Sequence, residues 1–161
     1  MIRAGTARRA QTGKSRFRVY FARAMDGETH DDILRTAAVV RAELRFIDAE
    51  MIDPFTTTEL SARDECTSSA EFAERIVLDD LALLATADAI LLDMTIPARN
   101  YIGCSCELAY AHTMNIPVFA YVGDTGYEKR SWLVYHAKVV TRTRSQCLGA
   151  LHAWSATHIS T

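Results

Sequence analysis

Glu107 is the residue whose position most favours covalent chemistry in this chain. It lies in the stretch Tyr101–Asp124, YIGCSCELAYAHTMNIPVFAYVGD, shortly after Gly103 and Ser105, which are small enough to permit a tight turn. We expect a helix to begin at Gly103 and to hold Glu107 in its first turn, where the helix dipole and free backbone N–H groups keep a carboxylate ionised. An ionised carboxylate can attack an anomeric carbon and hold the sugar covalently. The alternative is that Glu107 is an ordinary surface residue, since acidic side chains are favoured in the first turn of a helix.

The elements that must position Glu107 alternate between strands and helices. Strands are expected where β-forming residues cluster, and helices where apolar residues recur at helical spacing. The expected strands are Arg16–Ala22, Phe46–Ile52, Asp88–Met94, Pro117–Val122 and, at an edge, Lys138–Thr143; the expected helices are Asp31–Leu44, Ser68 or Ser69 to Thr86, Gly103–Asn115, Ser131–His136 and Gln146–Ser155. Between the second strand and the second helix, Asp53–Thr67 is expected to form a loop.

This alternation predicts an α/β fold. We expect residues 16–161 to form one domain, a doubly wound parallel sheet of about five strands, flavodoxin-like or Rossmann-like. Ligands of such sheets bind outside the carboxyl ends of the strands. These ends are expected at Ala22–Gly27, Asp93–Gly103 and Val122–Gly126, so the chemistry should come from these three loops.

Several short motifs, in their order and spacing, resemble the nucleoside 2-deoxyribosyltransferase family over residues 17–137. The motifs are G-x-x-x-E-L-A-Y-A from Gly103, P-V-F-A-Y from Pro117, Val19–Ala22 before a polar turn, and Asp80 eight residues before the strand start at Ala87-Asp88. The resemblance implies a doubly wound α/β fold and cleavage of N-glycosidic bonds through a glutamate. Glu107 occupies the position of that nucleophile.

The resemblance also implies roles for residues around Glu107. Tyr20 matches a tyrosine near the glutamate, and its phenol can hydrogen-bond Glu107 and fix the rotamer. Asp80 matches an aspartate that contacts the base, and it can protonate the leaving base if burial raises its pKa. The plain alternatives are an ordinary strand tyrosine and a solvated pair, Asp79 and Asp80. Further residues expected to bind substrate are Ala22, Arg23, Met25, Gly27, Asp93, Tyr101, Gly103, Ser105, Ser131 and Trp132.

One branch of the family, the deoxynucleoside 5′-monophosphate N-glycosidases, resembles the chain at a further point. These hydrolases carry a serine 24 residues after the nucleophile, contributed by the neighbouring subunit, and Ser131 stands at that offset. In the turn after the first strand, Arg23 would attract a phosphate, whereas Asp26 and Glu28 would repel one. Tyr101 replaces the serine or aspartate usual six residues before the nucleophile, so the group at the sugar 5′ position stays open.

Composition and charge limit the partners. The chain has 161 residues, 49% of them hydrophobic, and a net charge of −2, which disfavours a dedicated nucleic-acid binder. No apolar run approaches the roughly 18 residues that cross a membrane. Residues 1–15 are basic and free of acids, which favours a flexible tail, with an organelle transit peptide as the alternative. We expect a cytoplasmic protein.

The four cysteines lack the spacing of a metal site. Cys66, Cys104, Cys106 and Cys147 form no C-x-x-C pair, and no histidine stands at zinc-ligand spacing from them. We expect reduced thiols that are buried or half-buried, with Cys104 and Cys106 filling space beside the active turn.

The leading hypothesis is an enzyme of the nucleoside 2-deoxyribosyltransferase type, in which Glu107 cleaves the N-glycosidic bond and passes the sugar to another base or to water. It needs no cofactor and no metal, and its ligand is a nucleoside or nucleotide. The resemblance implies a homodimer or larger homo-oligomer. The alternatives are a 2′-deoxynucleoside 5′-monophosphate N-glycosidase and, from another class, a non-catalytic nucleotide-binding sensor on the same fold.

Overall fold

The computed structural model describes residues 16–59 and 68–158, and its centre is a sheet of five parallel strands. The strands are β1 (Phe17–Arg23), β2 (Ala49–Ile52), β3 (Ala89–Asp93), β4 (Val118–Tyr121) and β5 (Val139–Thr141), in the spatial order β2-β1-β3-β4-β5. This order confirms the predicted doubly wound sheet. The winding reverses between β1 and β3, and the crevice at such a switch point is where these folds bind ligands.

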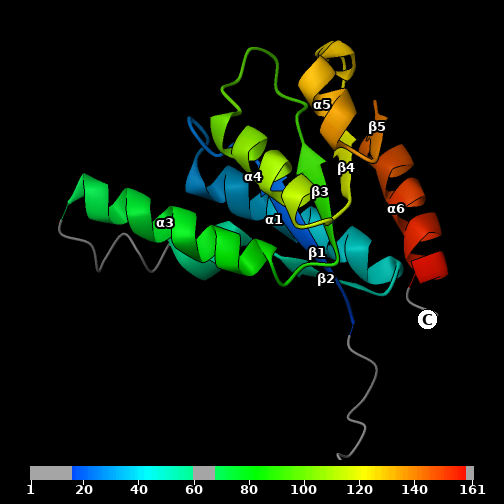
Figure 1. Ribbon diagram of the computed structural model, residues 1–161, viewed down its shortest axis with the longest axis horizontal. Coiled ribbons are helices and arrows are strands. Elements are labelled where there is room, and N and C mark those ends of the chain that lie inside the picture. Colours follow the sequence, from blue (N-terminus) through cyan, green and yellow to red (C-terminus); the bar gives the residue numbers. More distant parts are fainter. Residues whose placement is uncertain (1–15, 60–67, 159–161) are drawn as a thin grey trace, which may run out of the picture.

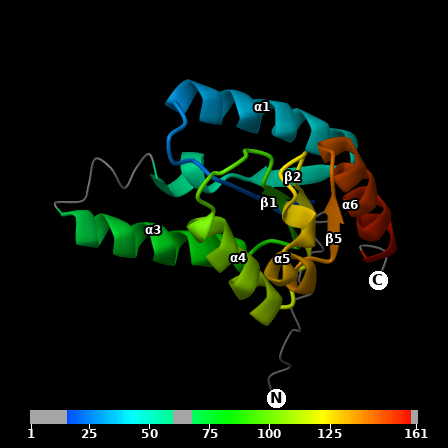
Figure 2. The same ribbon diagram turned by 90° about the horizontal axis from the view of Figure 1, so that it is seen from above.

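Helices cover both faces of the sheet (Figures 1 and 2). On one face lie α1 (His30–Phe46) and α6 (Arg144–His158), and on the other lie α3 (Ser69–Leu84), α4 (Ile102–Thr113) and the short α5 (Ser131–His136). Side chains alternate along β1, so Val19 and Phe21 pack toward α1 and α6, whereas Tyr20 and Ala22 pack toward α3 and α4. The alternation places Tyr20 on the face that carries Glu107.

Short polar residues set the helix ends. The side chains of Thr29 and Ser68 accept hydrogen bonds from backbone N–H groups in the first turns of α1 and α3. At the other end, Asp48 follows α1 with φ 55° and Asn115 follows α4 with φ 57°. These are left-handed conformations that stop a helix, and aspartate and asparagine adopt them more readily than most residues. The expectation of a serine cap at the start of α3 is confirmed at Ser68.

Two expected segments differ from the structure. Phe46 was assigned to the second strand because aromatic residues favour strands, but it ends α1 and is 90% exposed. Leu44, two residues earlier, is buried against the sheet and keeps this part of the chain helical. Its packing outweighs the strand propensity of Phe46. The expected loop after β2 contains a turn of π-helix, η1 (Phe55–Glu59), where Phe55 is buried. The rest of that loop, residues 60–67, lies outside the described residues.

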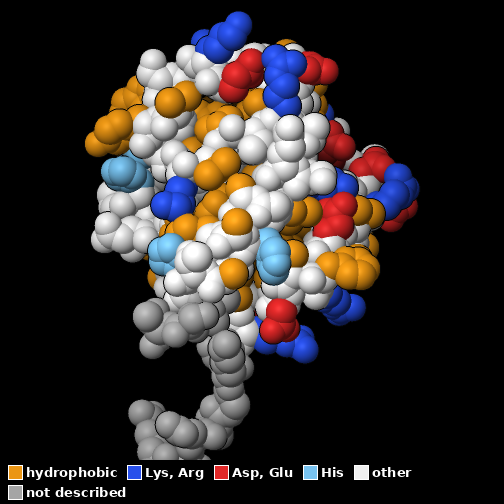
Figure 3. Space-filling model, turned by 90° about the vertical axis from the view of Figure 1, so that its right-hand side faces the viewer, with side chains coloured by type: hydrophobic (Ala, Val, Ile, Leu, Met, Phe, Trp, Pro, Cys, Tyr) orange, Lys and Arg blue, Asp and Glu red, His pale blue; other side chains and the backbone are white. Residues whose placement is uncertain are grey.

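The surface carries no single sign of charge on the side of β5 and α6, where acidic and basic side chains are intermixed (Figure 3). In the described part of the chain, no helix combines the length and the apolar character that spanning a membrane requires. Cys104 and Cys147 are buried free thiols, as expected, but Cys106 is exposed, because it lies on the outer face of α4. Cys66 and the basic residues 1–15 lie outside the described range.

Candidate active site

Glu107 lies one turn deeper in its helix than the sequence indicated. Helix α4 begins at Ile102, so Glu107 is its sixth residue and falls in the second turn. The predicted first-turn position is therefore wrong. The backbone N–H groups of the second turn are already bonded within the helix, so the helix dipole does little to keep this carboxylate ionised.

A hydrogen bond joins Glu107 to β1. The Tyr20 hydroxyl donates to Oε1 of Glu107 over 2.6 Å, and the Tyr20 side chain is fully buried. Burial and the neighbouring carboxylates raise the pKa of the Tyr20 phenol far above its ordinary value, so it remains a donor at any physiological pH. The phenol holds one carboxylate oxygen of Glu107 and leaves Oε2 for other partners.

Burial controls the protonation of Glu107. Removal of the carboxylate from water raises the pKa of Glu107 from 4.5 to about 7. The Tyr20 hydrogen bond lowers this pKa, the charge of Asp80 raises it, and the charge of Arg23 lowers it. The expectation that Glu107 is fully ionised at neutral pH is therefore wrong, because burial outweighs the groups that favour the carboxylate.

Glu107 and Asp80 line one cavity of about 480 Å³, which we call the Glu107 cleft. This volume is within the range of roughly 300–1,000 Å³ that small-molecule sites occupy. The loop after β1, helix α3 and the start of α4 form its walls. Of the expected substrate-binding residues, five line it: Arg23, Met25, Gly27, Tyr101 and Gly103. Asp26 and Glu28, the acids expected to repel a phosphate, also line it, and sequence patterns did not indicate the further lining residues His30, Phe72, Ile76 and Asn100.

The other expected residues lie elsewhere within this chain. Ala22 is buried in the core beneath the cleft. Asp93 lines a neighbouring cavity, where it accepts hydrogen bonds from the Tyr121 and Thr95 hydroxyls at 2.8 and 2.7 Å. Ser105 and Trp132 line a further cavity between α4 and α5, and Ser131 lies with Trp132 on the outside of α5.

A buried ion pair lies at the switch point of the sheet, next to the Glu107 cleft. Arg23, at the end of β1, contacts Oδ1 of Asp53 at 3.0 Å, and its guanidinium lies 4.6 Å from the centre of the Phe21 ring. Both charged side chains are at least 94% buried. Two nitrogens of Arg23, Nε and Nη2, have no hydrogen-bond partner among residues 16–59 and 68–158. The guanidinium therefore keeps a positive field near Glu107 that Asp53 does not fully neutralise.

Arg99 ties together the two loops at the mouth of the Glu107 cleft. Its guanidinium donates to the backbone carbonyl of Asp26 and to Oε1 of Glu28, the latter over 2.6 Å. Arg99 is more than 70 positions away from both of these partners, a proximity that sequence patterns cannot reveal. Gly27 lies directly beside the Arg99 guanidinium. Its φ of 79° is in the left-handed region, which glycine adopts without strain.

Comparisons with known proteins agree with this architecture. No protein-family model and no curated protein matches the chain. Among solved structures, a conserved protein of Enterococcus faecalis superimposes with a TM-score of 0.66 and 15% identity, over 87% of this chain and 99% of the other. The 2-deoxyribosyltransferase of Bacillus psychrosaccharolyticus gives 0.62 and 16%, over 88% and 95% of the two chains. That of Leishmania mexicana gives 0.61 and 17%, over 88% and 98%.

These neighbours match nearly whole chains in both directions. TM-scores of 0.61 to 0.66 establish a shared architecture, whereas at identities of 15 to 17% the function depends on the groups in the site. The resemblance seen in the sequence motifs is thus confirmed at the level of the fold: this chain has the fold of the 2-deoxyribosyltransferases.

Proposed function

We propose that this chain cleaves the N-glycosidic bond of 2′-deoxynucleosides with Glu107 as nucleophile and passes the sugar to a second base or to water. The observation that carries the proposal is the 2.6 Å hydrogen bond from Tyr20 to Glu107 at the edge of a cleft that Asp80 also lines. A nucleophile, a group that orients it and a potential acid thus converge at the switch point of a fold shared with two 2-deoxyribosyltransferases.

In the first half-reaction, the Glu107 carboxylate attacks C1′ of the sugar. The bond between C1′ and the base nitrogen breaks, its electron pair goes to the base, and the base takes a proton from Asp80 or from water. In the second half-reaction, a new base or water attacks C1′ from the opposite side, its proton passes to Asp80 or to water, and the bond from C1′ to the Glu107 oxygen breaks so that the carboxylate is released. Two successive displacements at one carbon give net retention.

The environment of Glu107 suits both halves of this cycle. A pKa of about 7 leaves about half of the Glu107 side chains ionised at neutral pH, which is enough for attack. The same burial makes the carboxylate less solvated and so more reactive toward a cationic anomeric centre. Tyr20 holds Oε1, so the attack would come from Oε2.

An exchange assay tests the proposal. A deoxynucleoside is incubated with a second free base, and free base and exchanged nucleoside are measured by chromatography. Exchange indicates a transferase, and free base without exchange indicates a hydrolase. Repetition with the 5′-monophosphates tests the alternative substrate.

The matched variants are Glu107→Gln and Glu43→Gln. We expect Glu107→Gln to lose at least ~10³-fold in kcat, because amide oxygen is a poor nucleophile. Glu43 pairs with Arg144, away from the cleft, so Glu43→Gln should keep the activity. Tight nucleoside binding without release of base, unchanged in Glu107→Gln, would instead support a non-catalytic sensor.

A further inference from the structure

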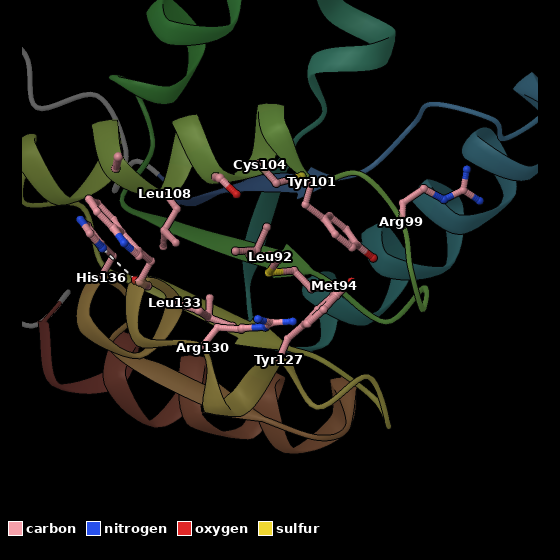
Figure 4. Close-up of a pocket in the computed structure, with 13 residues that line it drawn as sticks. Leu92, Met94, Arg99, Tyr101, Cys104, Leu108, Tyr127, Arg130, Leu133 and His136 are labelled. Atoms are coloured by element: carbon pink, nitrogen blue, oxygen red, sulfur yellow. Dashed lines mark hydrogen bonds between the residues drawn. The ribbon is translucent and has the colours of Figure 1, made fainter.

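A second cavity of about 360 Å³ lies between α4 and α5 (Figure 4). We call it the α4–α5 cavity. It shares Tyr101 and Cys104 with the Glu107 cleft, but neither Glu107 nor Asp80 lines it. Its volume falls in the range of roughly 300–1,000 Å³ typical of small-molecule sites. The cavity is therefore large enough for a ligand of its own.

The walls of this cavity are mostly apolar. The side chains of Leu92, Met94, Leu108 and Leu133 form much of its surface, together with the ring of Tyr127. At one end, Trp132 and His136 stack with ring centroids 5.3 Å apart and planes 7° from parallel. Apolar walls that include flat rings favour a ligand with a planar aromatic body, which can stack as well as exclude water.

The charge that faces the cavity is positive. None of its thirteen lining residues is an aspartate or a glutamate. Arg130 lines the cavity and, among residues 16–59 and 68–158, its side chain has no hydrogen bond or ion pair. Figure 4 shows Arg130 directed along the cavity toward Met94 and Tyr127, whereas Arg99 points away from it, toward its partners Asp26 and Glu28. One guanidinium is thus available to a ligand.

We infer that the α4–α5 cavity binds a small planar aromatic monoanion, with its ring between the apolar walls and its carboxylate or sulfonate on Arg130. A planar guanidinium binds such groups through two parallel hydrogen bonds, and the low polarity of the surrounding walls strengthens the contact. The inference does not rest on the proposed function, because the residues that carry it are not those that would cleave a nucleoside.

A pair of fluorescent probes tests this site. 1-Anilinonaphthalene-8-sulfonate carries a planar naphthalene ring and a single negative charge, and N-phenyl-1-naphthylamine is the same aromatic body without the sulfonate. We expect one sulfonate probe to bind per folded chain. Arg130→Gln should weaken its affinity by at least about tenfold, because a neutral amide cannot replace the two charge-assisted hydrogen bonds of the guanidinium. The neutral probe should bind Arg130→Gln and the parent chain equally. Arg142→Gln is the charge control, because Arg142 pairs with Asp124 outside the cavity.

The two tryptophans of the chain can show where the probe binds. Trp132 lies at the cavity, and Trp154 lies against Phe17 and Phe119 on the other face of the sheet. In a ¹H–¹⁵N spectrum, the sulfonate probe should move the indole signal of Trp132 and leave that of Trp154 in place. Ala109→Phe, which fills the cavity, should abolish binding, and Glu107→Gln should not affect it.

Three results would overturn the inference. The first is equal affinity of the sulfonate probe for Arg130→Gln, a variant at an exposed position that should fold normally. The second is binding of several probes per chain with the Trp132 signal unmoved, which would indicate scattered apolar patches. The third is affinity that falls as the protein concentration rises, because a second copy of the chain would then be covering the cavity.

Discussion

The Tyr20 hydroxyl lies 2.6 Å from Oε1 of Glu107, and this bond connects strand β1 to the second turn of α4. The two residues are 87 positions apart in the chain. Because the phenol keeps its proton at neutral pH, it donates to one carboxylate oxygen and fixes which one is engaged. It also opposes the effect of burial on the acidity of Glu107.

Replacement of Tyr20 by phenylalanine should slow catalysis and shift its pH dependence. The bond from Tyr20 lowers the pKa of Glu107, so its loss should move that pKa above 7 and the rate profile to higher pH. A hydrogen bond to a charged group contributes about 1.5–3 kcal/mol, which corresponds to a fall in kcat of roughly 10- to 100-fold. The measurement is kcat for deoxynucleoside cleavage between pH 5 and pH 9.

The control for this variant is Tyr121→Phe. Tyr121 is an equally buried tyrosine whose hydroxyl donates to Asp93 over 2.8 Å, on the face of the sheet away from Glu107. Both variants lose a buried hydroxyl, but only one touches the proposed nucleophile. Identical kcat values and identical pH profiles for the two variants would contradict the role of Tyr20.

The pH dependence of the parent enzyme should follow Glu107. If the carboxylate is the attacking form, kcat/KM should rise about tenfold per pH unit in acid and level off near pH 7. A profile that levels off near pH 4.5, the ordinary value, would show that burial does not control this group. Substrate depletion followed across a range of buffers at constant ionic strength measures the profile.

The same shift predicts how stability depends on pH. Burial raises the pKa of Glu107 from 4.5 to about 7, so the folded state holds the proton more tightly than the unfolded state. The stability that this proton contributes is complete below pH 4.5 and is lost as the pH rises through 7. The loss amounts to about 3 kcal/mol at most. Glu107→Gln should therefore raise the free energy of unfolding at pH 8 and leave it nearly unchanged at pH 4.5. Urea titrations at both values test this.

The fold was predictable because its signals are local. The apolar run of β3, Asp88–Met94, indicates a buried parallel strand, and the serine that caps α3 marks the start of that helix. The alternation of strands and helices then predicts a parallel sheet with helices on both faces. Boundaries were less predictable: Phe46 favours a strand by itself, but it continues a helix whose buried face ends at Leu44.

The site was predictable in its parts and not in its electrostatics. The family resemblance of the motifs brought Glu107, Tyr20 and Asp80 into one hypothesis, and in the fold Tyr20 bonds Glu107 beside a cleft that Asp80 also lines. The protonation of Glu107 was misjudged, because the degree of burial depends on how α3 and β1 pack around it. Arg99 and Asp53 were missed, since each contacts residues far away in the chain and neither belongs to a local motif.

Removal of one partner from the Arg23–Asp53 pair should destabilise the fold strongly. Both side chains are almost fully buried, so Asp53→Asn would leave a guanidinium without its counter-charge; Arg41, 3.8 Å from Oδ2 of Asp53, would lose its partner too. Such losses cost about 3–5 kcal/mol. The exposed pair of Arg142 and Asp124 is the control, and Asp124→Asn should change stability little. Chemical denaturation followed by circular dichroism compares the two; equal losses would show that the Arg23–Asp53 pair behaves as a surface pair.

The Arg99 bridge across the mouth of the cleft can be tested through the glycine beneath it. A Cβ at Gly27 would lie 2.5 Å from Nη1 of Arg99, so Gly27→Ala should push the guanidinium away from Asp26 and Glu28. Gly126→Ala is a closely matched control, since φ is 77° there and no atom lies within 4 Å of the added Cβ. Both variants carry a similar backbone strain of about 1–3 kcal/mol.

Of the two glycine variants, only Gly27→Ala should alter the affinity for substrate. With the bridge broken, the loop after β1 is held less firmly against the cleft, and KM should rise by about fivefold, the equivalent of one exposed charged contact. Arg99→Ala should raise KM to the same extent. The double variant Gly27→Ala/Arg99→Ala should show no further increase, because both changes remove one interaction. An increase in the double variant equal to the product of the single effects would show that Gly27 acts on the cleft independently of Arg99.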